Sequence, residues 1–163
     1  SMRKALLVSC VLALIAGPLA AQEGKQYRSQ GYVFFAPGLA SPGGHSFLHF
    51  GGGGNGLIYK GLGAGAELGY IFPSRSAADG VGLFSANGSY HFRKLPSGKL
   101  VPFVTAGYSM LFRSGVGNLV NFGGGVDYWF RERTGLHLEF RDHIWPECGP
   151  THFIQFRIGL SFR

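Results

Sequence analysis

The sequence predicts an all-β fold, an eight-stranded antiparallel up-and-down transmembrane β-barrel, and three observations support this prediction. Charged residues make up only 14% of the 163-residue chain, whereas Gly accounts for 28 residues and aromatic side chains for 15%. Ordinary globular proteins contain about 25% charged residues, so a soluble protein of this composition would have few groups to cover its surface. Segments of about ten residues alternate between apolar and polar side chains, as membrane-spanning strands do. After residue 22, no apolar segment is long enough to cross a bilayer as a helix.

The start of the chain has the features of a secretory signal peptide. Two basic residues and an apolar run over residues 5–16 precede a Gly-Pro break and the small residues of "LAAQ". The run is shorter than the roughly 20 residues that a transmembrane helix requires. We therefore expect residues 1–21 to direct export and residues 22–29 to form a short segment ahead of a barrel over residues 30–163.

Four alternating segments form the first half of the expected barrel. They are residues 30–38, 46–59, 62–72 and 81–92. The connections "LASPGGH", "KG" and "PSRSAADG" consist largely of residues that favour turns. Within residues 62–72, Leu68 and Tyr70 alternate with Glu67 and with glycines, so one face of this strand is apolar and the other is not.

Four further segments form the second half. They are residues 100–113, 119–130, 135–145 and 152–163, separated by "SGVGN", "RERT" and "PECGPT". All the connections are short enough to join neighbouring antiparallel strands. An even number of strands places both chain ends on one side, and we expect short turns on that side and slightly longer loops on the other. Closure of the barrel removes the exposed strand edges that a bilayer does not tolerate.

The two faces of these strands predict which side meets lipid. The polar face offers mainly Gly, Ser, Asn and a few charges, which suits a narrow packed interior better than a water-exposed surface. We therefore expect the apolar face to point outward and the polar face inward. A soluble or periplasmic β-barrel that binds a hydrophobic ligand is an alternative, and it would place Phe140, Phe156 and Ile158 inside.

The expected interior contains a small set of ionisable residues. They are Glu67, Asp127, His137, Glu139, Arg141 and Arg157. Antiparallel pairing of the last three strands should bring Asp127 near His137 or Glu139, and Arg157 near Glu139 and Arg141. Buried charges must pair, so we expect an ion-pair network that fills the interior and fixes strand register. An ion or proton path is the functional alternative.

Aromatic residues near the strand ends predict two girdles at the membrane interfaces. One rim should carry Tyr70, Phe72, Phe112 and Trp145, and the other Tyr90, Phe92, Tyr128 and Phe130.

Metal, cofactor and nucleic-acid sites are not expected. The net charge is +7, but the basic residues are scattered singly along the chain rather than clustered as in nucleic-acid-binding proteins. His143, Glu147, Cys148 and His152 surround one predicted loop, although their spacing fits no standard zinc-ligand pattern.

Taken together, the signal peptide, eight alternating strands and terminal strand "HFIQFRIGLSFR" resemble the OmpA-type superfamily of small outer-membrane barrels. That strand is similar to the family's assembly signal, an amphipathic strand ending in an aromatic residue, except that Arg163 follows Phe162. The resemblance implies insertion into the bacterial outer membrane by the barrel-assembly insertase and contact with lipid and lipopolysaccharide. It implies no single activity and no oligomeric state. We expect a structural, envelope-integrity role, with a narrow small-solute channel as the alternative.

The chain also resembles outer-membrane lipid A deacylases of the PagL type in size and strand number. Those enzymes carry a His and a Ser two residues apart near the outer end of the penultimate strand. Here His143 matches the histidine, but Trp145 occupies the position of the serine. Because hydrolysis by this route needs a nucleophile beside its base, we expect no enzymatic activity.

Overall fold

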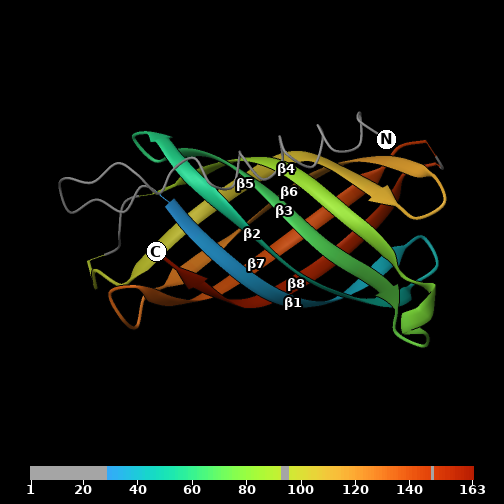
Figure 1. Ribbon diagram of the computed structural model, residues 1–163, viewed down its shortest axis with the longest axis horizontal. Coiled ribbons are helices and arrows are strands. Elements are labelled where there is room, and N and C mark those ends of the chain that lie inside the picture. The colour runs from blue at the N-terminus through green and yellow to red at the C-terminus, as the bar shows by residue number, and fades with distance from the viewer. Residues whose placement is uncertain (1–28, 93–95, 148) are drawn as a thin grey trace, which may run out of the picture.

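The computed structural model describes residues 29–92, 96–147 and 149–163, so the predicted signal peptide lies outside the described part of the chain. Eight antiparallel strands close into one barrel, each pairing with its neighbours in sequence and β8 pairing with β1 (Figure 1). The strands are β1 (Ser29–Ser41), β2 (His45–Tyr59), β3 (Leu62–Pro73), β4 (Val81–His91), β5 (Leu100–Phe112), β6 (Val116–Tyr128), β7 (Thr134–Trp145) and β8 (Thr151–Phe162). A single 3-10 turn, η1 (Ala77–Asp79), connects β3 to β4. The predicted fold class is confirmed.

The start of β6 differs from its prediction. The prediction starts this strand at residue 119 and leaves "SGVGN" as the connection before it. In the structure Val116, Gly117 and Asn118 pair with the last residues of β5, from Phe112 to Met110. The ladder therefore continues to a tight connection at 113–115, because cross-strand pairing outweighs the low strand propensity of Gly and Asn.

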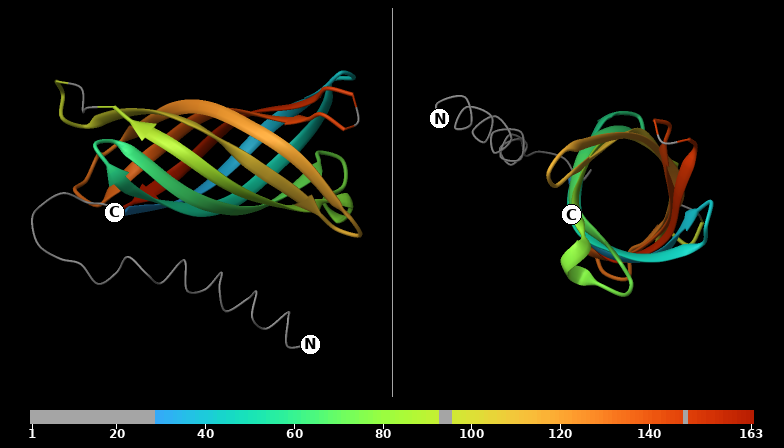
Figure 2. Two further views of the ribbon diagram at one scale, coloured as in Figure 1. Left: turned by 90° about the horizontal axis from the view of Figure 1, so that it is seen from above. Right: turned by 90° about the vertical axis from the view of Figure 1, so that its right-hand side faces the viewer.

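The two ends of the barrel carry connections of similar length (Figure 2). One end, here called the terminal end, holds the first residue of β1, the last residue of β8 and the connections 60–61, 92–99 and 129–133. The opposite end, here called the loop end, holds the connections 42–44, 74–80, 113–115 and 146–150. The expectation of short turns on one side and longer loops on the other is therefore wrong.

The apolar face of the barrel points outward. Phe140, Phe156 and Ile158 are 51%, 46% and 47% exposed, while Glu139 and Arg157 on the same strands are buried. The alternative with reversed faces required these three apolar side chains to lie inside, and the structure contradicts it. Among the described residues, no helix is long and apolar enough to cross a membrane.

An arginine placed on the outward face near the middle of the barrel should destabilise the protein strongly. Phe156 lies near the centre of β8, and Phe156→Arg should cost about 2–4 kcal/mol because the guanidinium would be held in hydrocarbon. The free energy of unfolding in lipid vesicles, measured by urea titration, checks this.

Leu62→Arg is the matched control, because Leu62 is also outward-facing but begins β3 at the terminal end. An arginine near the membrane interface should lower the free energy of unfolding by only about 0–1 kcal/mol. Equal costs at the two positions would contradict a hydrocarbon environment around the middle of the barrel.

Candidate functional site: the barrel interior

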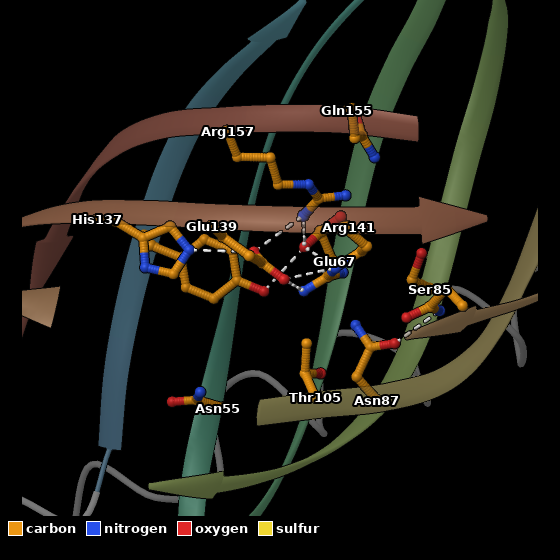
Figure 3. A network of polar contacts seen from close by, with 12 residues as sticks. Asn55, Glu67, Ser85, Asn87, Thr105, His137, Glu139, Arg141, Gln155 and Arg157 are labelled. Atoms are coloured by element: carbon orange, nitrogen blue, oxygen red, sulfur yellow. Dashed lines mark hydrogen bonds and ion pairs between the residues drawn. The ribbon is translucent and has the colours of Figure 1, made fainter. Parts of the chain in front are cut away.

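A buried carboxylate, Glu67 of β3, joins strands across the barrel interior (Figure 3). Its Oε2 atom lies 2.7 Å from Nη1 of Arg157 on β8 and 3.3 Å from Nη1 of Arg141 on β7. The Tyr32 hydroxyl of β1 donates a hydrogen bond of 2.9 Å to the same oxygen. Four strands therefore meet at one atom, and the carboxylate links walls of the barrel that are not all neighbours in the sheet.

A second buried carboxylate, Glu139, extends the network toward the terminal end. Arg141 donates to its Oε1 from Nε at 2.6 Å, and Nη2 of Arg141 lies 2.5 Å from the same oxygen. Nε2 of His137 lies 3.2 Å from Oε2 of Glu139, and Nδ1 lies 2.7 Å from Oδ1 of Asp127. A carboxylate only accepts hydrogen bonds, so both ring nitrogens of His137 donate, as in an imidazolium. Three carboxylates then face two guanidiniums and one imidazolium, and the buried charges balance.

Aromatic rings lie against two cations of this network, His137 and Arg157. The His137 ring is stacked between Tyr32 and Phe103, with centroid distances of 5.1 Å to each. The guanidinium of Arg157 lies over the ring of Phe34 at 4.1 Å, a cation–π arrangement. These two cations are thus both paired with carboxylates and stacked against rings, and they are buried from water.

Two glycines make room for these side chains. A Cβ atom at Gly123 would lie 3.2 Å from Cβ of Arg141 and 2.3 Å from the Phe140 carbonyl oxygen. A Cβ atom at Gly53, within the "GGGG" run of β2, would lie 3.0 Å from the Tyr32 hydroxyl and 2.6 Å from the Ala66 carbonyl oxygen. These inward positions therefore need glycine so that the large polar side chains can lie against the wall.

All six ionisable residues expected inside are buried there and contact one another. Asp127 contacts His137, and Nη1 of Arg157 lies 3.7 Å from Oε2 of Glu139. The contact of Glu67 with both arginines across the barrel was not predicted, because period-two alternation does not specify positions around the barrel. Tyr32, whose hydroxyl binds Glu67, was not among the predicted interior residues.

A layer of neutral polar side chains lies next to the charge network, toward the loop end. The hydroxyls of Ser85 and Ser109 are 2.8 Å apart, and Nδ2 of Asn121 donates to Ser109 at 2.8 Å. Gln155 bridges two histidines: its Oε1 lies 2.9 Å from Nδ1 of His49, and its Nε2 lies 3.1 Å from Nδ1 of His143.

Beyond this layer the interior becomes apolar and opens into a cavity of about 570 Å³. This cavity, here called the loop-end chamber, is lined among others by Phe47, Leu83, Leu111, Leu119, Trp145 and Phe153. The expectation of a polar, mostly filled lumen is therefore wrong for this end of the barrel. The inward face is not polar along the whole length of the strands, because its positions change from polar to apolar toward the loop end.

Trp145 does not belong to an aromatic girdle. It lies on the same face of β7 as His143, so it points into the chamber. A Cβ atom added at Gly117 would lie 3.0 Å from its ring.

The other seven predicted girdle residues lie near the two rims with half-buried or exposed rings. At the loop end the rings of Tyr70 and Phe72 are 5.7 Å apart, and at the terminal end those of Tyr90 and Phe92 are 5.0 Å apart.

Asp142 and His143 face opposite sides of β7, as strand geometry requires. Asp142 lies on the outward side, where its Oδ2 is 2.7 Å from Nδ1 of His152, whereas His143 lies inside. Within residues 29–92, 96–147 and 149–163, no group of three or more His, Cys, Asp and Glu side chains is placed to hold a metal ion.

Removal of the central carboxylate should destabilise the barrel. Glu67→Gln leaves Arg141 and Arg157 short of one negative charge, and breaking a buried pair in this way costs about 3–5 kcal/mol. Urea unfolding in lipid vesicles measures the loss.

The matched control is Glu67→Gln combined with Arg157→Gln, which removes one charge of each sign. We expect the double variant to lose clearly less stability than the sum of the two single losses, because no unpaired charge remains. Strict additivity would show that the two side chains are not energetically coupled.

Comparison with known proteins identifies the fold. No protein-family model and no curated protein matches the chain. Among solved structures, the N-terminal β-barrel domain of Pseudomonas aeruginosa OprF is 18% identical with a TM-score of 0.61, over 84% of this chain and 98% of that chain. Neisserial surface protein A (NspA) is 12% identical with a TM-score of 0.60, over 82% and 94% of the two chains.

A third outer-membrane protein, OprG of Pseudomonas aeruginosa, is 10% identical with a TM-score of 0.55, over 85% of this chain and 97% of that chain. Identities this low establish the fold and no specific activity. The chain has the fold of the OmpA-type small eight-stranded outer-membrane β-barrels.

Proposed function

We propose that this protein is a non-conducting barrel of the bacterial outer membrane with a structural role in the envelope. The observation that carries the proposal is the charge network centred on Glu67, which crosses the interior from β3 to β7 and β8. Glu67, Glu139 and Arg157 are each at most 2% exposed, so water does not reach these charges. Such a network acts as a plug and also ties the walls of the barrel together.

The narrow-channel alternative requires a water-filled path past this network. On the terminal side of the plug, between the inward side chains of β1, β4 and β7, the cavity measures about 20 Å³. A cavity of roughly 10–15 Å³ is the minimum for one water molecule. The space at the plug therefore suits an isolated water rather than a column of water, which favours the non-conducting barrel.

The outward surface supports placement in the outer membrane. Large apolar side chains such as Val33, Phe122 and Phe156 are about half exposed on it, as a lipid-facing barrel wall requires. We propose that this surface contacts outer-membrane lipid and lipopolysaccharide, and that the barrel-assembly insertase places the chain there after export. The loop end, on this proposal, faces the cell exterior.

Catalysis of the lipid A deacylase type is not part of the proposal. His143 forms its hydrogen bond with Gln155, and the residue two positions later is Trp145, whose indole is not a nucleophile. Trp145, which occupies the position of the serine in those enzymes, forms part of the wall of the loop-end chamber.

Reconstitution into planar bilayers should give no steady ionic conductance, because the plug has no continuous water path. As a matched variant, we propose replacing Glu67, Glu139, Arg141 and Arg157 together with alanine, which removes two charges of each sign. This variant should show discrete conductance steps where it folds, as checked by heat-dependent mobility in SDS gels. Conductance of the unmodified protein would favour the channel instead.

Deletion of the gene in its bacterial host should weaken the envelope. A structural barrel predicts greater sensitivity to SDS and leakage of periplasmic enzymes, both restored by the unmodified gene. The destabilised Phe156→Arg variant should restore them less well, in proportion to its lower amount in the membrane. An intact barrier after deletion, with a defect only in solute uptake, would contradict a structural role.

A further inference from the structure

The loop-end chamber has the size and walls of a small-molecule site. Binding pockets for small ligands measure about 300–1,000 Å³ and are mostly apolar with a few polar groups, and this chamber measures about 570 Å³. Leu83 and Leu119, on its wall, are at most 2% exposed. A filled structural core has no reason to keep a chamber of this size, because packing its walls together would stabilise the protein.

A buried polar atom on the chamber wall has no protein partner. His143, which is 1% exposed, lines the chamber, and its Nε2 atom forms no hydrogen bond with the protein. Its other ring nitrogen, Nδ1, faces Nε2 of Gln155 at 3.1 Å. The amide nitrogen of Gln155 only donates, so Nδ1 of a neutral His143 accepts and the ring proton lies on Nε2. The residues that line the chamber therefore carry two buried N–H donors without a partner, Nε2 of His143 and the indole Nε1 of Trp145, and leaving such buried donors unpaired is costly.

The charges near the chamber favour a neutral ligand. The charged residues in its lining, Asp79 and Arg113, stand at the rim and have opposite signs. Deeper in the barrel, the carboxylates of the network are already balanced by Arg141, Arg157 and the His137 imidazolium. A carboxylate or phosphate at the floor would add a buried negative charge without a counterion, which is expensive in a low-dielectric interior. A carbonyl or hydroxyl oxygen would accept from His143 without that cost.

The mouth of the chamber connects with the membrane-facing surface. Its lining includes Phe72, Phe112 and Val116, which stand at the rim on the outward-facing positions of β3, β5 and β6. Val116 is 63% exposed. At these three positions apolar surface reaches from the outer wall to the rim, beside polar residues such as Asp79 and Arg113, which favours a mainly apolar molecule that reaches the site from the outer leaflet.

We propose that the loop-end chamber binds one neutral, mainly apolar molecule with a hydrogen-bond acceptor at its inner end, such as a long-chain ketone or alcohol. The acceptor oxygen receives the Nε2 proton of His143, and the hydrocarbon part lies against Phe47, Leu83, Leu119 and Trp145. This binding function goes beyond the structural role proposed above and does not depend on whether the barrel conducts ions.

The two tryptophans of the chain provide matched reporters for a binding experiment. Trp145 lies in the chamber, whereas Trp129 lies at the terminal end with Arg163 stacked over its ring at 4.0 Å. The variant W129F therefore reports from the chamber alone, and W145F reports from outside it. The probe is a long-chain methyl ketone with bromine at the far end of its chain, titrated into each variant in lipid nanodiscs, because bromine quenches nearby indole fluorescence.

Binding in the chamber predicts quenching of W129F that saturates at one probe per protein, with little quenching of W145F. Equal, non-saturating quenching in both variants would show partition into the bilayer only and would overturn the proposal.

The contact with His143 is tested in the W129F background with His143→Phe, which keeps the ring and removes the N–H. We expect about fivefold weaker binding of the ketone, the typical effect of one neutral hydrogen bond, and unchanged binding of a brominated alkane of equal length. Equal effects on both probes would overturn the role of His143. If His143→Phe does not fold, Leu111→Phe serves as a second variant, because it narrows the chamber and leaves the histidine in place. It should weaken the binding of both the ketone and the alkane. Unchanged binding of both would place the probes outside the chamber.

Discussion

The absence of water in a bilayer determines most of this structure. Every backbone amide and carbonyl of a spanning segment needs a partner within the protein, and a sheet meets that demand only when it closes. β1 and β8 provide the closure, for example through Tyr32 opposite Ser161 and Phe35 opposite Ile158. Once the ladder is closed, strand alternation separates the side chains: apolar ones meet lipid, and charged ones can lie only inside. The composition, the faces and the buried ion pairs all follow from that requirement.

The narrow interior then has to accommodate charges at low dielectric, and it does so by balancing them. Glu67 receives hydrogen bonds from Tyr32, Arg141 and Arg157, which belong to three different strands. A network of this kind is weak evidence for stability, because hydrophobic residues of similar volume often stabilise as well. Its clearer consequence is specificity: a register shift of two residues in any of these strands would keep the apolar face outward but would separate the ion pairs. The network therefore fixes the register that the apolar outer face alone leaves less well defined.

Period-two alternation predicted the eight strands and the inward direction of the ionisable residues, because alternation is a local property of each strand. It could not predict that Glu67 meets Arg157, since that contact depends on strand tilt and on position around the barrel. The chamber is a different case, because its signal was present in the sequence. Phe47, Leu119 and Phe153 share the inward parity of His49, Asn121 and Gln155. The inward face changes from polar to apolar along each of these strands, so a single polarity does not describe the whole face, and Trp145 lies on the apolar part of such a face.

The order of plug and chamber along the barrel distinguishes binding from transport. A molecule in the chamber meets the layer of Gln155 and His143, and behind it the paired charges of Glu67 and Arg157. To pass further, an apolar molecule would have to separate ion pairs and leave them without partners, at a cost of several kcal/mol for each pair broken. On the functions proposed above, the chamber would take up and release its ligand on the same side of the membrane. Occupancy of the chamber and permeability of the barrel would then be independent properties.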